Sequence, residues 1–267
     1  MARRMNRAGL NRASIWGAGV LAVAMLSLTA YAVFSGDEEP AGSAGKDGAK
    51  SSASASAAPG PTYGAPSDWT EPERWAALPR NTRVDKYGNK IGFPQSVEGA
   101  QAMLVASSST AVEGDRSTSD VQLGIYESYV AQADRSAANA ERIELESIQT
   151  DKKLRDELGL STGGPLPAGA YARNQVIGFK VIKASPTTVS AWLLTRHTTK
   201  AGETAKETGG YTRSLAAVVW EDEDWKLSGD ATRSALQETG DQEKPPIAAP
   251  GDEAFNTGGW TAIREAS

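Results

Sequence analysis

The fold is decided by the stretch YARNQVIGFKVIKA over residues 171–184, which the turn Ser185-Pro186 joins to the stretch TVSAWLLTRHT over residues 188–198. Apolar residues alternate with polar or small ones, which is the period of a half-buried strand. The first stretch alternates at Ile177, Phe179 and Val181. In the second, Val189, Ala191 and Leu193 share one face, and Trp192 and Leu194 share the other.

Two more strands follow in the chain. Residues 211–221 are rich in apolar residues, and residues 225–227 begin the next strand after the acidic run Glu221–Asp224. Consecutive strands joined by short turns pair as an antiparallel meander. We therefore expect one antiparallel sheet across residues 171–227.

Three helices are predicted before the sheet, over residues 96–111, 120–133 and 135–158. Ser96 is a good N-cap for the first, and Gly159 fits the position after the last turn of the third. Helices followed by a meander indicate an α+β fold in which the helices pack on a curved antiparallel sheet.

The N-terminal region predicts a membrane anchor. Residues 15–34 carry no charge, and such a run reaches about 30 Å as a helix, which is the thickness of the hydrocarbon layer. Arginines alone precede it, at Arg3, Arg4, Arg7 and Arg12. The positive-inside rule then keeps a basic tail, residues 1–12, in the cytoplasm. We predict a single-pass signal-anchor over residues 13–35 with everything after it outside the cell membrane.

A cleaved signal peptide is the alternative reading. Ala30-Tyr31-Ala32 fits a small-x-small cleavage site, although the apolar run is longer than a signal core of 7–15 residues. The pair Arg3-Arg4 is the start of a twin-arginine export signal, but the residues after it do not continue that motif.

Composition divides the rest of the chain into three parts. Residues 36–67 are mostly Ala, Gly, Ser and Pro, with too little apolar surface to fold, so we expect a disordered linker. Residues 68–236 form the expected α+β domain. Residues 237–267 are polar and rich in Pro and Gly, and are expected as a mostly irregular tail in which Trp260 could dock on the domain.

Charge and cysteine content exclude several function classes. The chain of 267 residues has a net charge of −5, and without the four arginines of the tail the remainder carries −9. An acidic exterior argues against a nucleic-acid partner, because that affinity depends on neutralising phosphates. The absence of cysteine excludes disulfides, thiolate catalysis and zinc–cysteine sites.

The single histidine, His197, is the one candidate for acid–base chemistry. By alternation it falls on the face of Leu193, Ala191 and Val189, but it lies near a strand end beside polar neighbours. We expect a structural or exposed histidine rather than a catalytic one.

The acidic run Glu221–Asp224 is a candidate calcium site. Calcium takes about 6–8 oxygen ligands on a converging loop, and four acids in a tight turn do not supply that arrangement by spacing alone. We expect a solvated turn.

The tryptophans could form a platform for a carbohydrate or peptide, but large aromatics also dominate cores of this size. Trp220 and Trp225 are expected to pair across a hairpin, and Trp69 and Trp260 to be exposed. The sequence thus predicts no catalytic residue, no cofactor-binding residue and no metal ligand.

The hairpin Val218-Val219-Trp220 followed by Asp224–Leu227 resembles the late hairpin of the nuclear transport factor two-like (cystatin-like) fold. Trp75 with Leu78-Pro79, and then Gly92-Phe93-Pro94, are similar to single-pass membrane proteins of actinobacterial integrative and conjugative elements. The resemblance implies a cystatin-like exterior domain of unknown function, and its architecture is that of a scaffold component of conjugation or secretion machines.

These observations favour a non-enzymatic, membrane-anchored protein with an extracytoplasmic interaction or assembly domain. Its partners would be other proteins of the membrane or cell envelope, or further copies of itself. The alternative is a tethered domain that binds a small apolar ligand or a cell-wall fragment between helices and sheet.

Overall fold

The computed structural model describes residues 68–161 and 163–264. The predicted cytoplasmic tail, membrane anchor and linker, residues 1–67, lie outside these residues. In the part that the structure describes, no helix is both long and apolar enough to cross a membrane.

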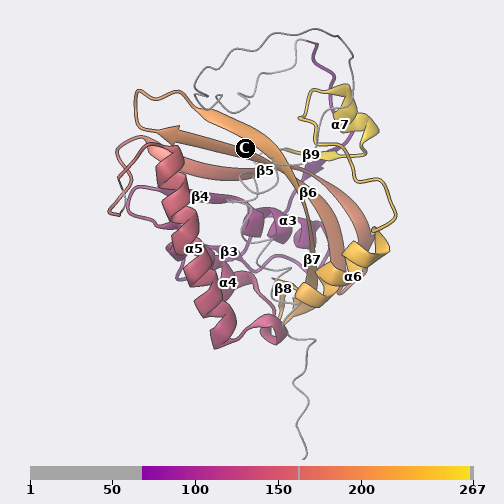
Figure 1. Cartoon of the computed structure of the whole chain (residues 1–267). Coiled ribbons are helices and arrows are strands. Elements are labelled where there is room, and N and C mark those ends of the chain that lie inside the picture. The colour runs from indigo at the N-terminus through magenta and orange to yellow at the C-terminus, as the bar shows by residue number, and fades with distance from the viewer. Residues whose placement is uncertain (1–67, 162, 265–267) are drawn as a thin grey trace, which may run out of the picture.

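The predicted α+β class is confirmed: helices pack on a seven-stranded mixed sheet (Figure 1). A separate two-stranded hairpin, β2–β3, lies beside it. The strands are β1 (Trp75–Ala77), β2 (Arg83–Val84), β3 (Lys90–Ile91), β4 (Thr110–Glu113), β5 (Ala170–Ala184), β6 (Thr188–Ala201), β7 (Thr208–Glu221), β8 (Asp224–Leu227) and β9 (Thr261–Arg264). The helices are α3 (Val97–Ser108), α4 (Thr118–Tyr129), η1 (Gln132–Asp134), α5 (Ala137–Glu157), α6 (Gly229–Glu238) and α7 (Glu253–Thr257).

Strands β5 to β8 form the predicted antiparallel meander, but the sheet as a whole is mixed. The strand order is β1-β9-β5-β6-β7-β8, and β4 pairs with the N-terminal part of β5. β9 runs antiparallel to β5, and β1 runs parallel to β9. The prediction of a purely antiparallel sheet is therefore wrong at this edge, where two short strands from opposite ends of the described residues meet.

Two irregularities in β5 interrupt its alternation. The register with β6 shifts between Val176 and Gly178 and again between Val181 and Lys183. Such bulges bend a strand and change which face a side chain occupies. Phe179 consequently packs on the helix side of the sheet, whereas Ile177 packs on the far side, although the sequence predicts both on one face.

Three helices lie on one side of the sheet, with α3 and α4 against the strands and α5 packed along α4. Each begins at a serine whose hydroxyl accepts a backbone N–H: Ser96 for α3, Ser117 for α4 and Ser136 for α5. These caps satisfy amide groups that have no partner in the first turn. The end of α5 matches the prediction, because Gly159 adopts a φ of +65° after it.

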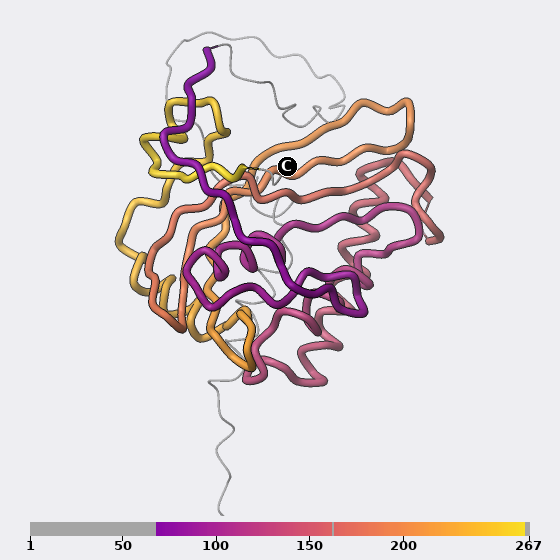
Figure 2. The backbone as a smooth tube through the Cα atoms, turned by 180° about the vertical axis from the view of Figure 1, so that it is seen from behind, coloured from indigo at the N-terminus to yellow at the C-terminus, as the bar shows by residue number. Residues whose placement is uncertain are grey.

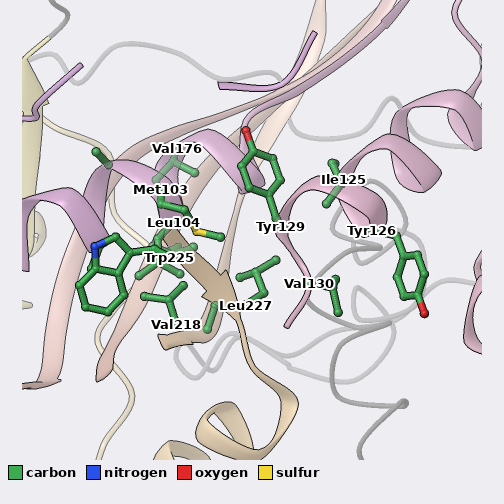
Figure 3. Close-up of a cluster of buried hydrophobic side chains, with 14 of the residues drawn as sticks. Met103, Leu104, Ile125, Tyr126, Tyr129, Val130, Val176, Val218, Trp225 and Leu227 are labelled. Atoms are coloured by element: carbon green, nitrogen blue, oxygen red, sulfur yellow. The ribbon is translucent and has the colours of Figure 1, made fainter. Parts of the chain in front are cut away.

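The sheet separates two hydrophobic clusters. The larger lies under α3, α4 and α5 and includes Leu193, Val218 and Trp225 (Figure 3). The smaller lies on the other face and includes Trp192 and Leu194. The predicted division of β6 into two faces is therefore confirmed.

The segment expected as a mostly irregular tail, residues 237–267, contains regular structure in its described part. It holds the end of α6, helix α7 and strand β9, and β9 lies between β1 and β5. Figure 2 shows the N-terminal segment that follows residue 68 running beside this C-terminal segment. The two ends of the described chain thus complete one edge of the sheet together.

Candidate functional site

An open cavity of about 530 Å³ lies at one end of the molecule. It is bounded by the β2–β3 hairpin, the end of α3, the inner face of α4, and strands β4 to β6. Ile125 and Tyr129 of α4 form part of its wall, while amides of Asn89 and Asn174 and the hydroxyl-bearing Thr110 form another part. The cavity is thus bordered by polar as well as apolar side chains.

The charged residues around this cavity are mostly basic. Four cationic residues line it, Lys90, Arg116, Arg173 and Arg196, against one carboxylate, Glu207. A positive cavity in an acidic protein concentrates anions.

Two of these cations form ion pairs. Nη2 of Arg173 lies 2.6 Å from Oε2 of Glu113, and Nη2 of Arg196 lies 3.1 Å from Oε1 of Glu207. Lys90 and Arg116 form no ion pair with any other described residue. Lys90 and Arg116 are therefore the cations available to an incoming anion, whereas the charges of Arg173 and Arg196 are already met by carboxylates.

The hairpin that carries Lys90 is fixed to α4. The amide of Asn89 donates to the hydroxyl of Ser128 at 2.8 Å, and the hydroxyl of Tyr129 donates to the carbonyl of Lys90 at 2.8 Å. Burial, together with the nearby charge of Asp85, raises the pKa of Tyr129 well above its usual value. The phenol therefore stays protonated and holds the hairpin over the physiological pH range.

His197 lies on the helix side of β6, as its alternation predicts, because the register of β6 with β7 is unbroken from residue 188 to residue 199. It is not exposed: only 8% of its surface reaches solvent, and Nδ1 lies 2.8 Å from Oδ1 of Asn174. Of the two alternatives expected, a structural or an exposed histidine, the structure has the buried one, because β6 continues to Ala201 and His197 is not at a strand end. Burial lowers the pKa of His197, which favours the neutral ring.

This buried histidine predicts a pH dependence of stability. The folded state binds its proton less readily than the unfolded state, so its contribution is complete above about pH 6.5 and is lost as the pH falls toward the folded pKa. We expect urea unfolding between pH 7 and pH 5 to show a shallower loss of stability for His197→Gln than for the wild type. The difference is at most about 1.4 kcal/mol per pH unit for one proton. If the free energy of unfolding fell equally with pH in the two proteins, this result would contradict a buried neutral histidine.

Only two of the four side chains in the acidic run Glu221–Asp224 are exposed to solvent, so the expected solvated turn is found in part. Glu221 accepts the backbone N–H of Gln132 at 2.9 Å, and the buried Asp224 accepts the backbone N–H of Gly92 at 3.2 Å. Nζ of Lys226 lies 3.4 Å from Oδ2 of Asp224. Two of the four carboxylates are therefore committed to the fold, and Asp222 and Glu223 alone are exposed.

The two exposed acids form a strained two-residue hairpin turn. Both have positive φ, +50° for Asp222 and +59° for Glu223. Two-residue hairpin turns with this backbone conformation favour the sequence Asn-Gly. We expect Glu223→Gly to raise the free energy of unfolding by about 0.5–1 kcal/mol, because glycine adopts this conformation without a Cβ penalty. Glu223→Ala, which removes the same charge and keeps the Cβ, is the control in thermal unfolding. Equal gains from both variants would assign the effect to charge instead.

The tryptophans belong mostly to the core. The rings of Trp220 and Trp225 meet edge to face at 5.3 Å, so the predicted pair across the hairpin is confirmed. Trp69 is 57% exposed, as expected. The expectation that Trp260 is exposed is wrong: it is fully buried and donates Nε1–H to the carbonyl of Pro246 at 2.8 Å.

Within residues 68–161 and 163–264, no cluster of three or more His, Asp and Glu side chains is arranged to hold a metal ion. Comparison with known proteins finds no matching family model, no similar curated protein and no similar solved structure. The function therefore has to be inferred from the chain's own residues.

Sequence reasoning missed the basic lining of the cavity. Its members come from the hairpin, the turn before α4 and two long strands, so no spacing in the sequence joins them. One local pattern could have indicated these residues. Arg173 and Arg196 each stand between two buried neighbours in a strand, so alternation places both arginines on the opposite face from those neighbours.

Proposed function

We infer that this chain is a single-pass membrane protein whose domain acts outside the cell membrane as an interaction and assembly domain of a conjugation or secretion apparatus. In this proposal residues 13–35 are the anchor, residues 36–67 are the linker, and the domain is of the cystatin-like kind. The resemblance and the N-terminal sequence pattern support the topology. The outer face of α5 is the observation that carries the interaction role.

Helix α5 carries large aliphatic side chains on two opposite sides, and the fold buries only one of these sides. Its inner residues Ile143 and Leu154 are buried, and the helix packs along α4. On the outside, Leu145 and Ile148 are each 55% exposed. Two large aliphatic side chains held outward on a rigid 21-residue helix offer a surface to another protein.

His197 is placed as a structural residue rather than as an acid–base group. General acid–base catalysis needs a titratable group within reach of substrate and with a pKa near neutral pH. The imidazole is instead buried, oriented by Asn174 and kept neutral.

Deletion of the gene tests this proposal, with element transfer and ordinary growth measured in the same strains. A large loss of transfer at normal growth, restored by the wild-type gene, is the expected result. Unchanged transfer would reject a role in the transfer apparatus.

The basic cavity favours a second candidate function, a tethered domain that binds an anionic cell-wall fragment. Two cations outside any ion pair of the described residues, Lys90 and Arg116, and several amides suit carboxylates or phosphates better than an apolar ligand. Mass spectrometry of small molecules released from the natively purified protein tests it. A co-purifying anion that is lost from Arg116→Ala would support this candidate, and its absence from the wild type would favour assembly.

A further inference from the structure

The outer face of α5 has the spacing of a coiled-coil seam. Glu141, Leu145, Ile148 and Lys152 follow one another at intervals of four, three and four residues and are all exposed. Residues at this spacing form one stripe along a helix. The buried stripe Ile143, Ser147, Thr150 and Leu154 has the same spacing on the opposite side.

The outer stripe is complementary to itself. If two copies of α5 lie antiparallel with a twofold axis midway between residues 146 and 147, Leu145 of each copy faces Ile148 of the other. The same operation places Glu141 of each copy opposite Lys152 of the other. An isologous interface requires this self-complementarity, with apolar residues at the axis and opposite charges at both ends.

We propose that the outer face of α5 binds the same face of a second copy of this chain as an antiparallel helix pair. This proposal rests on the proposed function, because it names the partner of the assembly surface. Figure 1 shows α5 at the periphery of the described domain, next to α4.

The charges at the two ends of the stripe form no ion pair within the described part of the chain. Glu141 and Lys152 form no ion pair with other described residues, whereas Glu146 pairs with Arg142 and Asp151 pairs with Arg155 on the same helix. Glu141 and Lys152 are eleven positions apart, about 16.5 Å along the helix, so they cannot pair with each other within one copy. Across the twofold contact they can.

The interface is small, so the dimer is weak. A helix of 21 residues is about 31 Å long, and one helix pair lies at or below the lower limit of standard interfaces. A dissociation constant on the order of 10 µM suits such a contact. Anchoring in one membrane would raise the effective concentration of the two copies.

Sedimentation equilibrium of the full chain in density-matched detergent micelles tests the proposal. The wild type is expected to show a monomer–dimer equilibrium. Leu145→Lys and Glu141→Lys are each expected to weaken it at least about tenfold, because they place lysines against an apolar residue or against Lys152. The matched control Ile247→Lys changes an aliphatic residue of similar exposure, 51%, far from α5 in the sequence, and is expected to have no effect.

The charge-swapped double variant Glu141→Lys with Lys152→Glu decides the geometry. It restores both opposite-charge contacts across the twofold axis, so the affinity is expected to return to within about threefold of the wild type. A full chain that remains monomeric at 500 µM, a double variant as weak as Glu141→Lys, or an equal loss in Ile247→Lys would each overturn the proposal.

Transfer measured with the same variants separates this proposal from the proposed function. A monomeric wild type that supports transfer, with transfer lost in Leu145→Lys, would overturn self-association and assign the face to another protein. A dimer with the expected rescue, in cells whose transfer does not depend on the gene, would support self-association and reject the role in transfer.

Discussion

Trp225→Ala is expected to lower the free energy of unfolding by about 3–5 kcal/mol, the usual effect of removing a fully buried large aromatic residue. Trp225 has no exposed surface and lies in the cluster between the helices and the sheet (Figure 3). Its Nε1–H donates to the carbonyl of Pro94 at 2.9 Å, and its ring meets that of Trp220. The substitution removes the packing and one of the two hydrogen bonds that the carbonyl of Pro94 accepts, while the bond from the N–H of Ser96 remains.

Equilibrium urea unfolding measures this loss, since a domain of ordinary stability has only about 5–15 kcal/mol in total. Trp225→Phe keeps most of the ring and loses the donor, so it should lie between the wild type and the alanine variant. Trp69→Ala, at a tryptophan that is 57% exposed, should change stability by less than about 0.5 kcal/mol. Equal effects at positions 69 and 225 would contradict the placement of Trp225 at the centre of the core.

The sequence predicts the parts of this fold whose signals are local. The meander follows from alternation and short turns, and the observed strands β5, β6 and β7 begin and end within a few residues of the predicted ones. The start of α3 follows from the capping Ser96, and the end of α5 follows from Gly159. α4 begins two residues before the predicted start, because Asp120 completes a capping box with Ser117 instead of opening the helix.

The missed elements depend on contacts between distant residues. β1 has only three residues and no alternation, and it pairs with β9 nearly 190 residues later, where the N–H of Ala262 donates to the carbonyl of Arg74 at 2.9 Å. Ala111, predicted on the first helix, belongs to β4, which pairs with β5. Both short strands form because of the strand that each one pairs with. Their own residues therefore carry no pattern that predicts the pairing.

The same distinction applies to the candidate site and the candidate interface. The basic lining of the cavity is assembled from separate elements and could not be predicted from spacing. The stripe on α5 is periodic within one helix, so its spacing is visible in the sequence. Whether the stripe packs in the core or forms a surface for a partner depends on which face of the helix is buried. Only the burial of Ile143 and Ser147 against the exposure of Leu145 and Ile148 shows that the helix keeps an apolar face outward.

Trp260→Ala is expected to destabilise the edge of the sheet that β1 and β9 form beside β5. Trp260 is fully buried, stacks on Phe255 with ring centroids 6.5 Å apart and precedes β9 directly. Its loss should cost about 3–5 kcal/mol, and the remaining contacts of β1 and β9 are few. Local opening at this edge should therefore precede global unfolding.

Hydrogen exchange checks where the loss falls. In Trp260→Ala the amides of β1 and β9, among them that of Ala262, should exchange much faster, while the central strands β6 and β7 retain more of their protection. Ile247→Ala, in the same C-terminal segment but 51% exposed, is the control and should leave exchange unchanged. Faster exchange spread evenly over the sheet would show that the C-terminal segment unfolds with the core. Exchange confined to β1 and β9 would show that Trp260 holds a separate cooperative unit, in which the N-terminal strand depends on the C-terminal one.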